Sequence, residues 1–145
     1  MVLIRPATAS EIWTIRKLVL SAKLDMTQLR SQQFLVIEFD GRIIGCGQLR
    51  EFPDAQELGS LVVVKKYRQQ GLATLLIQKL LEIATKPVYL ECLGQKLADF
   101  YTHRGFVEVD YHHLPSSLQA KYRLSHITKN IIHLPVMFMY YENNS

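Results

Sequence analysis

The stretch from Glu57 to Thr74, ELGSLVVVKKYRQQGLAT, contains the clearest arrangement for binding a ligand. An apolar strand leads through a short polar turn directly into a helix, and the first backbone N–H groups of a helix have no partner within it. With the positive end of the helix dipole, these donors form a site for phosphate. Gly71 would let a pyrophosphate approach the backbone, and Ala73 would leave the next turn uncrowded. The alternative is that Gly71 only makes a strand-to-helix turn, which is a common use of glycine.

Two segments of the chain resemble a known family. Residues 68–73, Arg-Gln-Gln-Gly-Leu-Ala, resemble the Gln/Arg-x-x-Gly-x-Gly/Ala motif of the GNAT superfamily of N-acetyltransferases, and Leu61, Val63 and Tyr67 before them fit the same signature. Residues 100–106, Phe-Tyr-Thr-His-Arg-Gly-Phe, resemble the family's Phe-Tyr-x-x-x-Gly-Phe segment. One departure is that Gly94-Gln95 stands where the family often carries an asparagine. This departure weakens any expectation of a side-chain contact to CoA from that helix, but leaves the pyrophosphate turn unaffected.

The resemblance implies a fold and a reaction. The fold is a mixed α/β (α+β) domain of three layers, with a twisted, mostly antiparallel sheet of about seven strands between helices. A single such domain would span residues 1–145, although the resemblance is specific only over residues 57–106. The reaction is transfer of an acetyl group from the cosubstrate acetyl-CoA to a primary amine. Family members bind acetyl-CoA through positions that correspond here to Leu61, Val62, Val63, Arg68, Gln69, Gln70, Gly71, Leu72, Ala73, Thr74 and Phe100.

Two residues are candidates for acid–base catalysis. A lysine-like amine has a pKa of about 10.4 and must be neutral to attack a thioester, so a general base assists the reaction. Glu57 looks like the catalytic glutamate of histone-acetylating relatives, and the alternative is a solvated glutamate at the start of a strand. Tyr101 would protonate the departing CoA thiolate, and the alternative is a packed helix tyrosine beside Leu97.

Other reactive side chains give weaker signals. Cys46 and Cys92 could form an acyl-enzyme, but both lie in predicted strands without an adjacent His–acid pair, so direct transfer in a ternary complex is expected. The histidines that raise the question of a metal site are His103, His112, His113, His126 and His133. Neighbouring residues of a strand face opposite sides, and no carboxylate or cysteine joins these histidines at ligand spacing. No metal is therefore predicted.

Helices are predicted where apolar residues recur at three- and four-residue spacing. Thr8 and Glu11 have the spacing of a capping box ahead of a first helix that runs to about Ala22. A helix over residues 70–86 would bury one apolar face, made of Leu72, Leu75, Leu76, Leu80 and Ile83. Three shorter helices are predicted at residues 25–30, around 97–101 before Gly105, and around 118–124.

Strands are predicted over residues 1–5, 34–39, 42–50, 57–64, 88–92, 106–111 and 131–141. Asp40-Gly41 predicts a type I′ turn between the second and third of these strands. Gly45 and Gly47 indicate a bulge or the close approach of another segment. Pro135 favours an edge position or a bulge in the last strand.

The composition is that of an ordinary globular protein, with 145 residues of which 48% are hydrophobic and 21% charged. No apolar run approaches the roughly 18 residues of a membrane span, and the first residues lack a secretory pattern. We therefore expect no membrane partner and a cytoplasmic location. The net charge of +4 suits a phosphorylated cofactor as well as nucleic acid, but the basic residues are scattered, so nucleic acid is not the expected partner.

Two functions besides catalysis stay open. One is a non-catalytic module that binds or senses acyl-CoA, and the other is a basic module that binds nucleic acid or protein near Lys65-Lys66. The acceptor amine, whether a small molecule or a peptide, is set in the family by segments that correspond to residues 22–33 and 112–130, and neither carries a motif. The aromatic residues at 137–141 belong either to the core or to a contact between two copies in a homodimer.

Overall fold

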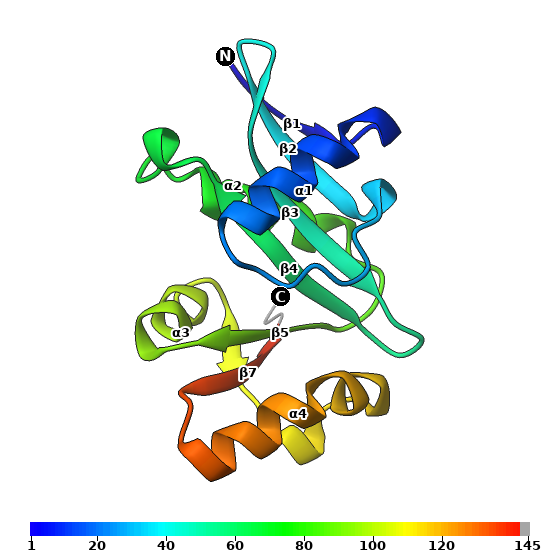
Figure 1. Ribbon diagram of the computed structural model, residues 1–145, viewed down its shortest axis with the longest axis vertical. Coiled ribbons are helices and arrows are strands. Elements are labelled where there is room, and N and C mark those ends of the chain that lie inside the picture. The colour runs from blue at the N-terminus through cyan, green and yellow to red at the C-terminus, as the bar shows by residue number, and fades with distance from the viewer. Residues whose placement is uncertain (143–145) are drawn as a thin grey trace. The chain divides into compact units, whose positions relative to one another are not determined.

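The computed structural model describes residues 1–142. The strands are Val2–Pro6 (β1), Phe34–Phe39 (β2), Arg42–Glu51 (β3), Gln56–Val63 (β4), Val88–Leu93 (β5), Phe106–Glu108 (β6) and Val136–Tyr141 (β7). The α-helices are Ile12–Ser21 (α1), Leu72–Ile83 (α2), Gln95–Thr102 (α3) and Ser116–Ile132 (α4) (Figure 1). Single 3-10 turns lie at Ala9–Glu11 (η1), Ser31–Gln33 (η2), Lys65–Tyr67 (η3) and Tyr111–His113 (η4). The strands form a seven-stranded mixed sheet in the order β1-β2-β3-β4-β5-β7-β6, which confirms the predicted fold class.

Contacts along the chain divide these elements into two compact units. The first unit comprises residues 1–51 and 58–84, and the second comprises residues 52–57 and the chain from Thr85 onward. Strand β4 begins in the second unit with Gln56 and Glu57 and continues in the first unit. The single domain over residues 1–145 stays a prediction.

The hairpin of β2 and β3 follows from its turn residues. Asp40 and Gly41 both have positive φ angles, of 50° and 75°, as the predicted type I′ turn requires. The pairing shifts from Ile37↔Gly45 to Glu38↔Ile43, so β3 carries one extra residue at a bulge. A methyl group at Gly45 would lie 2.8 Å from the carbonyl oxygen of Val62, which confirms the predicted close approach.

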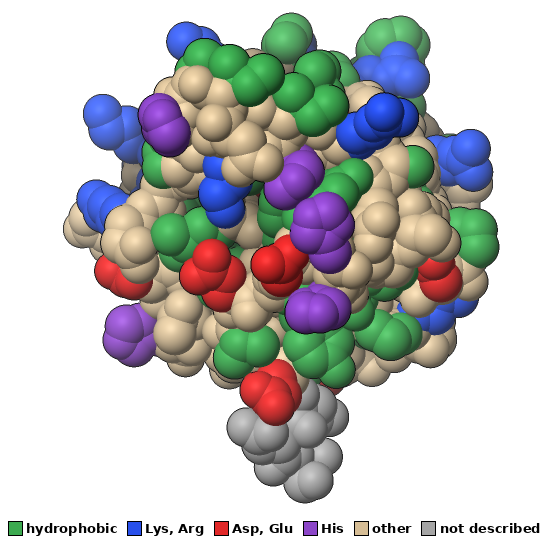
Figure 2. Space-filling model, turned by 90° about the horizontal axis from the view of Figure 1, so that it is seen from below, with side chains coloured by type: hydrophobic (Ala, Val, Ile, Leu, Met, Phe, Trp, Pro, Cys, Tyr) green, Lys and Arg blue, Asp and Glu red, His purple; other side chains and the backbone are tan. Residues whose placement is uncertain are grey.

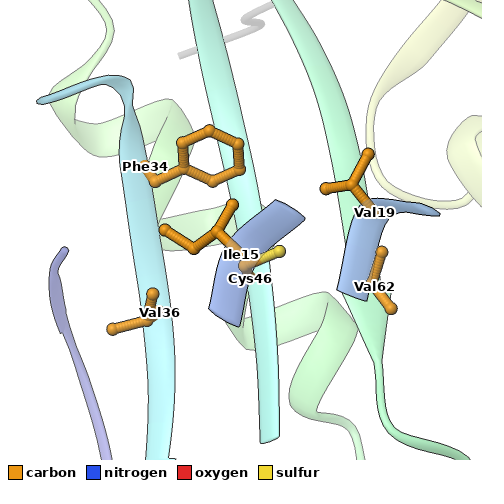
Figure 3. Packing of buried hydrophobic residues seen from close by; sticks show 6 residues of the cluster. All are labelled: Ile15, Val19, Phe34, Val36, Cys46 and Val62. Carbon is orange, nitrogen blue, oxygen red and sulfur yellow. The ribbon is translucent and has the colours of Figure 1, made fainter. Parts of the chain in front are cut away.

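Neighbouring residues of β3 point to opposite faces of the sheet, and α1 covers one of these faces while α2 covers the other. On one face, Cys46 lies in a fully apolar cluster with residues of α1, β2 and β4: Ile15, Val19, Phe34, Val36 and Val62 (Figure 3). On the other face, a methyl group at Gly47 would lie 2.8 Å from Leu80 of α2. The absence of a side chain at Gly47 therefore lets α2 pack close to the sheet. Each aliphatic side chain buried this way stabilises the unit by roughly 1.5–3 kcal/mol.

The second unit is built on strands β5, β7 and β6, which pair antiparallel. Helix α3 packs against β5 and β6, and helix α4 packs against β7. Leu118 and Tyr122, one turn apart on α4, are buried, and the Tyr122 ring stacks on Phe138 of β7 at 5.2 Å between centroids. These two anchors hold α4 against the sheet.

Helix α4 is longer than predicted. It covers Ser116–Ile132, so Ile131 and Ile132 are helical and not the start of the last strand. β-Branched residues are weak helix formers, and the packing of Leu118 and Tyr122 against the strands outweighs that local preference. His133, with a left-handed φ of 56°, ends the helix, and Pro135 lies just before β7, not inside it.

Three further expectations are wrong. Residues 25–30 form no helix, because the Asp25 side chain accepts the N–H of Thr27 and turns the chain locally. The strand at 106–111 ends at Glu108, since Asp110 accepts the N–H of His112 and opens the 3-10 turn η4. On α2, Leu75 and Ile83 are exposed while Ile77 is buried, because the buried stripe is centred on Leu76. None of the helices within residues 1–142 is both long and apolar enough to cross a membrane.

Candidate active site

The turn between β4 and α2 is exposed and depends on left-handed backbone. Gly71 has φ 78° and ψ 8° at the N-cap of α2, and Gln69 has φ 64°. A methyl group at Gly71 would meet nothing within 4 Å. Glycine is therefore favoured there by its backbone angle and not by crowding, and its open side leaves the backbone accessible to a ligand.

The start of α2 supplies backbone donors directly after this turn. The N–H of Leu75 donates to the carbonyl of Gly71 at 3.0 Å, which is the first hydrogen bond of the helix. The N–H groups of Leu72 and Ala73 precede that bond and so have no acceptor within the helix. Arg68 donates from Nε to the carbonyl of Val63 at 2.7 Å and thereby fastens the turn to the end of β4. The turn combines free donors, the helix dipole and a cation, as an anion site requires.

Strand β4 is interrupted just before the residues expected to contact the acetyl group. Ser60 has a left-handed φ of 52° inside the strand. Leu61 is half-buried, while Val62 and Val63 are buried. A left-handed residue breaks the regular ladder and re-aims the N–H groups of the residues after it. The backbone therefore changes direction at the place where donors to a thioester carbonyl are expected.

Glu57 is a buried carboxylate with charged and polar partners. It is 3% exposed, so the alternative of a solvated surface glutamate is wrong. Lys121 Nζ lies 2.5 Å from its Oε1, and the Tyr122 hydroxyl donates to its Oε2. Glu57 also pairs with Tyr89 of β5 in the parallel register that begins at Gln56↔Val88. The carboxylate is thus held in one orientation from α4, which the sequence did not indicate.

Tyr101 and Phe100 lie on α3 within an aromatic cluster. The Tyr101 ring packs edge-on against Phe100 and Phe106, at centroid distances of 5.3 and 5.5 Å. Tyr101 is packed, as the alternative reading expects, but Leu97 one turn before it is exposed and Ala98 is the buried neighbour. The guanidinium of Arg104 lies 3.6 Å above the Phe100 ring. Burial raises the pKa of Tyr101 well above its usual value, so the phenol keeps its proton across the physiological range.

The cysteines and histidines show no catalytic arrangement within residues 1–142. Cys46 and Cys92 are free and buried, and burial raises their thiol pKa values to about 12 and about 11, so neither is a thiolate at neutral pH. Several histidine side chains lie on the face shown in Figure 2. The His126 ring stacks on Tyr111 at 4.0 Å between centroids. His112 and His113 lie in η4 and not in a strand. The described residues hold no cluster of three or more metal-binding side chains.

A second group of polar residues near β4 was missed by sequence reasoning. Gln48 and Arg50 of β3 are almost fully buried, and both hydrogen-bond the side chain of Ser60. The sequence signal that could have found them is the presence of a glutamine and an arginine in a strand whose other residues are typical of a hydrophobic core. We call Gln48, Arg50 and Ser60 the buried polar cluster.

The family is established by comparison with known proteins. A family model described as the acetyltransferase (GNAT) domain matches residues 30–108, more than half of the chain. This chain belongs to the GNAT acetyltransferase family. The matched residues include both the turn before α2 and the Phe-Tyr-x-x-x-Gly-Phe segment.

Individual relatives agree with this family. An amino-acid acetyltransferase of Aliivibrio fischeri is 32% identical over 104 residues, which are 69% of this chain and 23% of that protein. The chain thus spans about a quarter of the length of that relative. The N-acetylglutamate synthase of Neisseria gonorrhoeae, solved with coenzyme A and N-acetyl-glutamate, has a TM-score of 0.73 at 22% identity, over 99% of this chain and 36% of that one. Rv2747 of Mycobacterium tuberculosis, solved with CoA, has a TM-score of 0.74 at 20% identity, over 97% and 99% of the two chains. The two structures show the same fold.

Proposed function

We propose that this chain transfers an acetyl group from acetyl-CoA to the α-amine of an amino acid. The observation that carries the proposal is the exposed left-handed turn at Gln69–Gly71, which opens α2 within the stretch matched by the family. The amino-acid acceptor is inferred from the name of the Aliivibrio fischeri relative, and the cosubstrate from that family and from the CoA in the solved neighbours.

In the proposed reaction, the amine attacks the thioester carbonyl directly in a ternary complex. The nitrogen forms the new C–N bond, the C–S bond breaks, and CoA leaves as its thiol. Backbone N–H groups of Leu61 to Val63 would stabilise the negative charge on the carbonyl oxygen, and a donor of this kind contributes about 3 kcal/mol to lowering a barrier. The pyrophosphate would bind the turn of residues 68–74, through the free N–H groups of α2 and the charge of Arg68.

Glu57 is proposed as the base that takes the proton from the amine, directly or through water. Its support is a buried carboxylate that Lys121 and Tyr122 hold in place, because a fixed orientation is what a general base needs. The competing role is structural, since the same contacts fasten α4 to the start of β4. The two roles differ in what happens to turnover when the negative charge is removed.

Tyr101 is proposed as the donor of a proton or hydrogen bond to the leaving thiolate. Its hydroxyl has no hydrogen-bond partner among residues 1–142, and its raised pKa keeps it a donor. An ordinary thiol has a pKa of about 8.5, so this assistance is small compared with that of the base.

The test is turnover by the purified chain. Release of CoA thiol is followed with acetyl-CoA and each of the amino acids, with a polyamine and a peptide for comparison, and the acetylated product is identified by mass spectrometry. We expect turnover with at least one amino acid. Glu57→Gln should lower kcat by roughly 100-fold or more and leave the dissociation constant of acetyl-CoA unchanged. Tyr101→Phe should lower kcat by about tenfold or less.

Glu82→Gln is the matched control, since Glu82 is an exposed glutamate of α2. A kcat for Glu57→Gln equal to that of the control would assign Glu57 a structural role only. A rise in melting temperature with acetyl-CoA, combined with no turnover on any amine, would instead support the acyl-CoA sensor. No response to acetyl-CoA at all would favour the interaction module.

A further inference from the structure

The loop between α1 and β2, residues 22–30, is held mainly by polar bonds. Leu24 and Met26 are exposed, whereas Ala22 and Leu29 pack against the apolar cluster around Cys46. Lys23 and Gln28 have left-handed φ angles of 55° and 50°, which are unfavourable for residues other than glycine. Such angles persist only where surrounding contacts enforce them.

Arg50 joins this loop to β4. Its Nε donates to the carbonyl of Thr27 at 3.1 Å, and its Nη2 donates to the carbonyl of Asp25 at 3.2 Å. The same Nη2 donates to the Ser60 hydroxyl at 2.9 Å. One planar guanidinium, 2% exposed, therefore contacts two residues of the loop and the left-handed residue of β4.

Gln48 makes a parallel connection. Its Nε2 donates to the carbonyl of Gln28 at 2.5 Å and to the side chain of Gln33 at 2.9 Å. Its Oε1 accepts the Ser60 hydroxyl at 2.9 Å. One buried side-chain amide thus links two left-handed residues, Gln28 in the loop and Ser60 in the strand.

Ser60 is held through both its side chain and its backbone. Its hydroxyl donates to Gln48 and accepts from Arg50, and its carbonyl accepts the thiol of Cys46 at 3.4 Å. At the preceding residue, a methyl group on Gly59 would lie 2.8 Å from Cζ of Arg50, so the guanidinium occupies the space beside the Gly59 backbone. The strand interruption is enforced by the side chains of β3.

We propose that Arg50, with Gln48, is a positioning residue of the acetyl transfer, which orders the α1–β2 loop and the Gly59–Ser60 backbone together. The proposal rests on the proposed function, because it assigns the loop to the acceptor and the backbone after Ser60 to the thioester carbonyl. Arg50 itself is engaged by Thr27, Asp25 and Ser60, so its proposed action is through these residues. Its loss should therefore loosen both the acceptor contacts and the carbonyl donors, and leave the CoA turn at residues 68–74 intact.

The test compares Arg50→Met with Arg42→Met. Both arginines lie on β3, but Arg42 is exposed at the other end of the strand. For Arg50→Met we expect amide hydrogen exchange to rise in residues 22–33, the KM for the amino acid to rise about tenfold and kcat to fall by about tenfold, since small misplacements of reactants have effects of this order. The dissociation constant of acetyl-CoA should change less than about twofold, and Arg42→Met should resemble the wild type.

Conservative variants keep the test decisive if Arg50→Met folds poorly. Arg50→Lys keeps the charge but lacks the planar fork that reaches three acceptors, so it should rescue folding and not the KM for the amino acid. Faster exchange in residues 22–33 with an unchanged KM and kcat would reduce the cluster to a structural role and overturn the proposal. Unchanged exchange would overturn it as well. Lack of any turnover by the wild type is a different result, because it refutes the proposed function while the exchange data still report on the loop.

Discussion

Besides the β2–β3 hairpin turn, the first unit has left-handed backbone in the turn before α2 and in the buried polar cluster with its loop, and it is enforced differently in these two regions. In the turn before α2, Gln69 and Gly71 are exposed, and open space surrounds the glycine. In the buried polar cluster and its loop, Gln28 and Ser60 adopt the same region of φ without being glycine. At Gly71 the left-handed backbone depends on the residue type, whereas at Gln28 and Ser60 it depends on side-chain hydrogen bonds from β3.

This difference decides what each region can do. Backbone that is left-handed because of glycine leaves its N–H groups free for a ligand. Backbone that is left-handed because of buried hydrogen bonds has its side chains occupied, and it can only orient the next residues of the chain. The first region is suited to binding, and the second to positioning.

The largest expected effect comes from breaking the glycine-dependent region. Gly71→Val places a β-branched residue at φ 78° and a side chain against the approaching pyrophosphate. We expect the dissociation constant of acetyl-CoA to rise roughly 10- to 100-fold, as for loss of one or two charge-assisted hydrogen bonds. Isothermal titration measures this change directly.

Gly41→Val is the matched control for Gly71→Val. Gly41 has φ 75°, and a methyl group there also meets nothing within 4 Å, but it lies at the tip of the β2–β3 hairpin. Both variants should lose about 1–2 kcal/mol of unfolding free energy. Equal affinity for acetyl-CoA in the two variants would show that the turn before α2 has no special part in binding.

A smaller effect is expected from two substitutions of Ser60. Ser60→Ala keeps the strained φ and leaves Gln48 and Arg50 without the hydroxyl, which should cost about 1–3 kcal/mol of unfolding free energy. Ser60→Gly loses the same hydroxyl but adopts positive φ freely, so it should be the more stable of the two by about 1 kcal/mol. Urea denaturation measures both. If alanine were the more stable, backbone strain at Ser60 would not be the dominant cost.

The smallest expected effect is that of removing an ion pair near the protein surface, in contrast to the hydrogen bonds of the buried polar cluster. Arg5 pairs with Glu11 at 2.7 Å and with Glu38 at 2.8 Å near the protein surface. The guanidinium lowers the pKa of Glu11 from 4.5 to about 2. Because the folded-state pKa is the lower one, the stabilisation is complete above about pH 4.5 and is lost as the pH falls towards 2.

Glu11→Gln should therefore lose less stability than the wild type between about pH 5 and about pH 3, as measured by urea denaturation at several pH values. Glu82→Gln, at an exposed site of α2, should follow the wild type. If the unfolding free energy of Glu11→Gln changed with pH in parallel with that of the wild type, the Arg5–Glu11 pair would contribute nothing to stability in acid.

The elements that could be predicted are those with local causes. The Asp40-Gly41 turn, the capping box at Thr8 and Glu11, and the apolar spacing of α1 all match the structure because short-range chemistry determines them. The loop at 25–30 could not be predicted as a whole: the turn from Asp25 to Thr27 is local, but the rest of its conformation depends on Gln48 and Arg50, which are distant in the chain.

The residues of the candidate site also differ in whether their causes are local or distant in the chain. Gly71 could be found because a glycine at a strand–helix junction is visible in the sequence. The partners of Glu57 could not, because Lys121 and Tyr122 are 64 and 65 residues away and lie on a helix whose length local propensity underestimates. The burial of Glu57 likewise depends on packing that the neighbouring sequence does not indicate.

The contact between Gly59 and Arg50 also constrains the order in which these two positions can change during evolution. A methyl group at residue 59 would collide with the guanidinium of Arg50. A substitution of Gly59 that occurs while Arg50 is still present therefore destabilises the protein. If Arg50 is replaced by a shorter residue first, position 59 becomes permissive. Sequences that keep the arginine should therefore keep the glycine, whereas those that have lost the arginine are free to vary at both sites, and the two positions should covary across descendants of this chain.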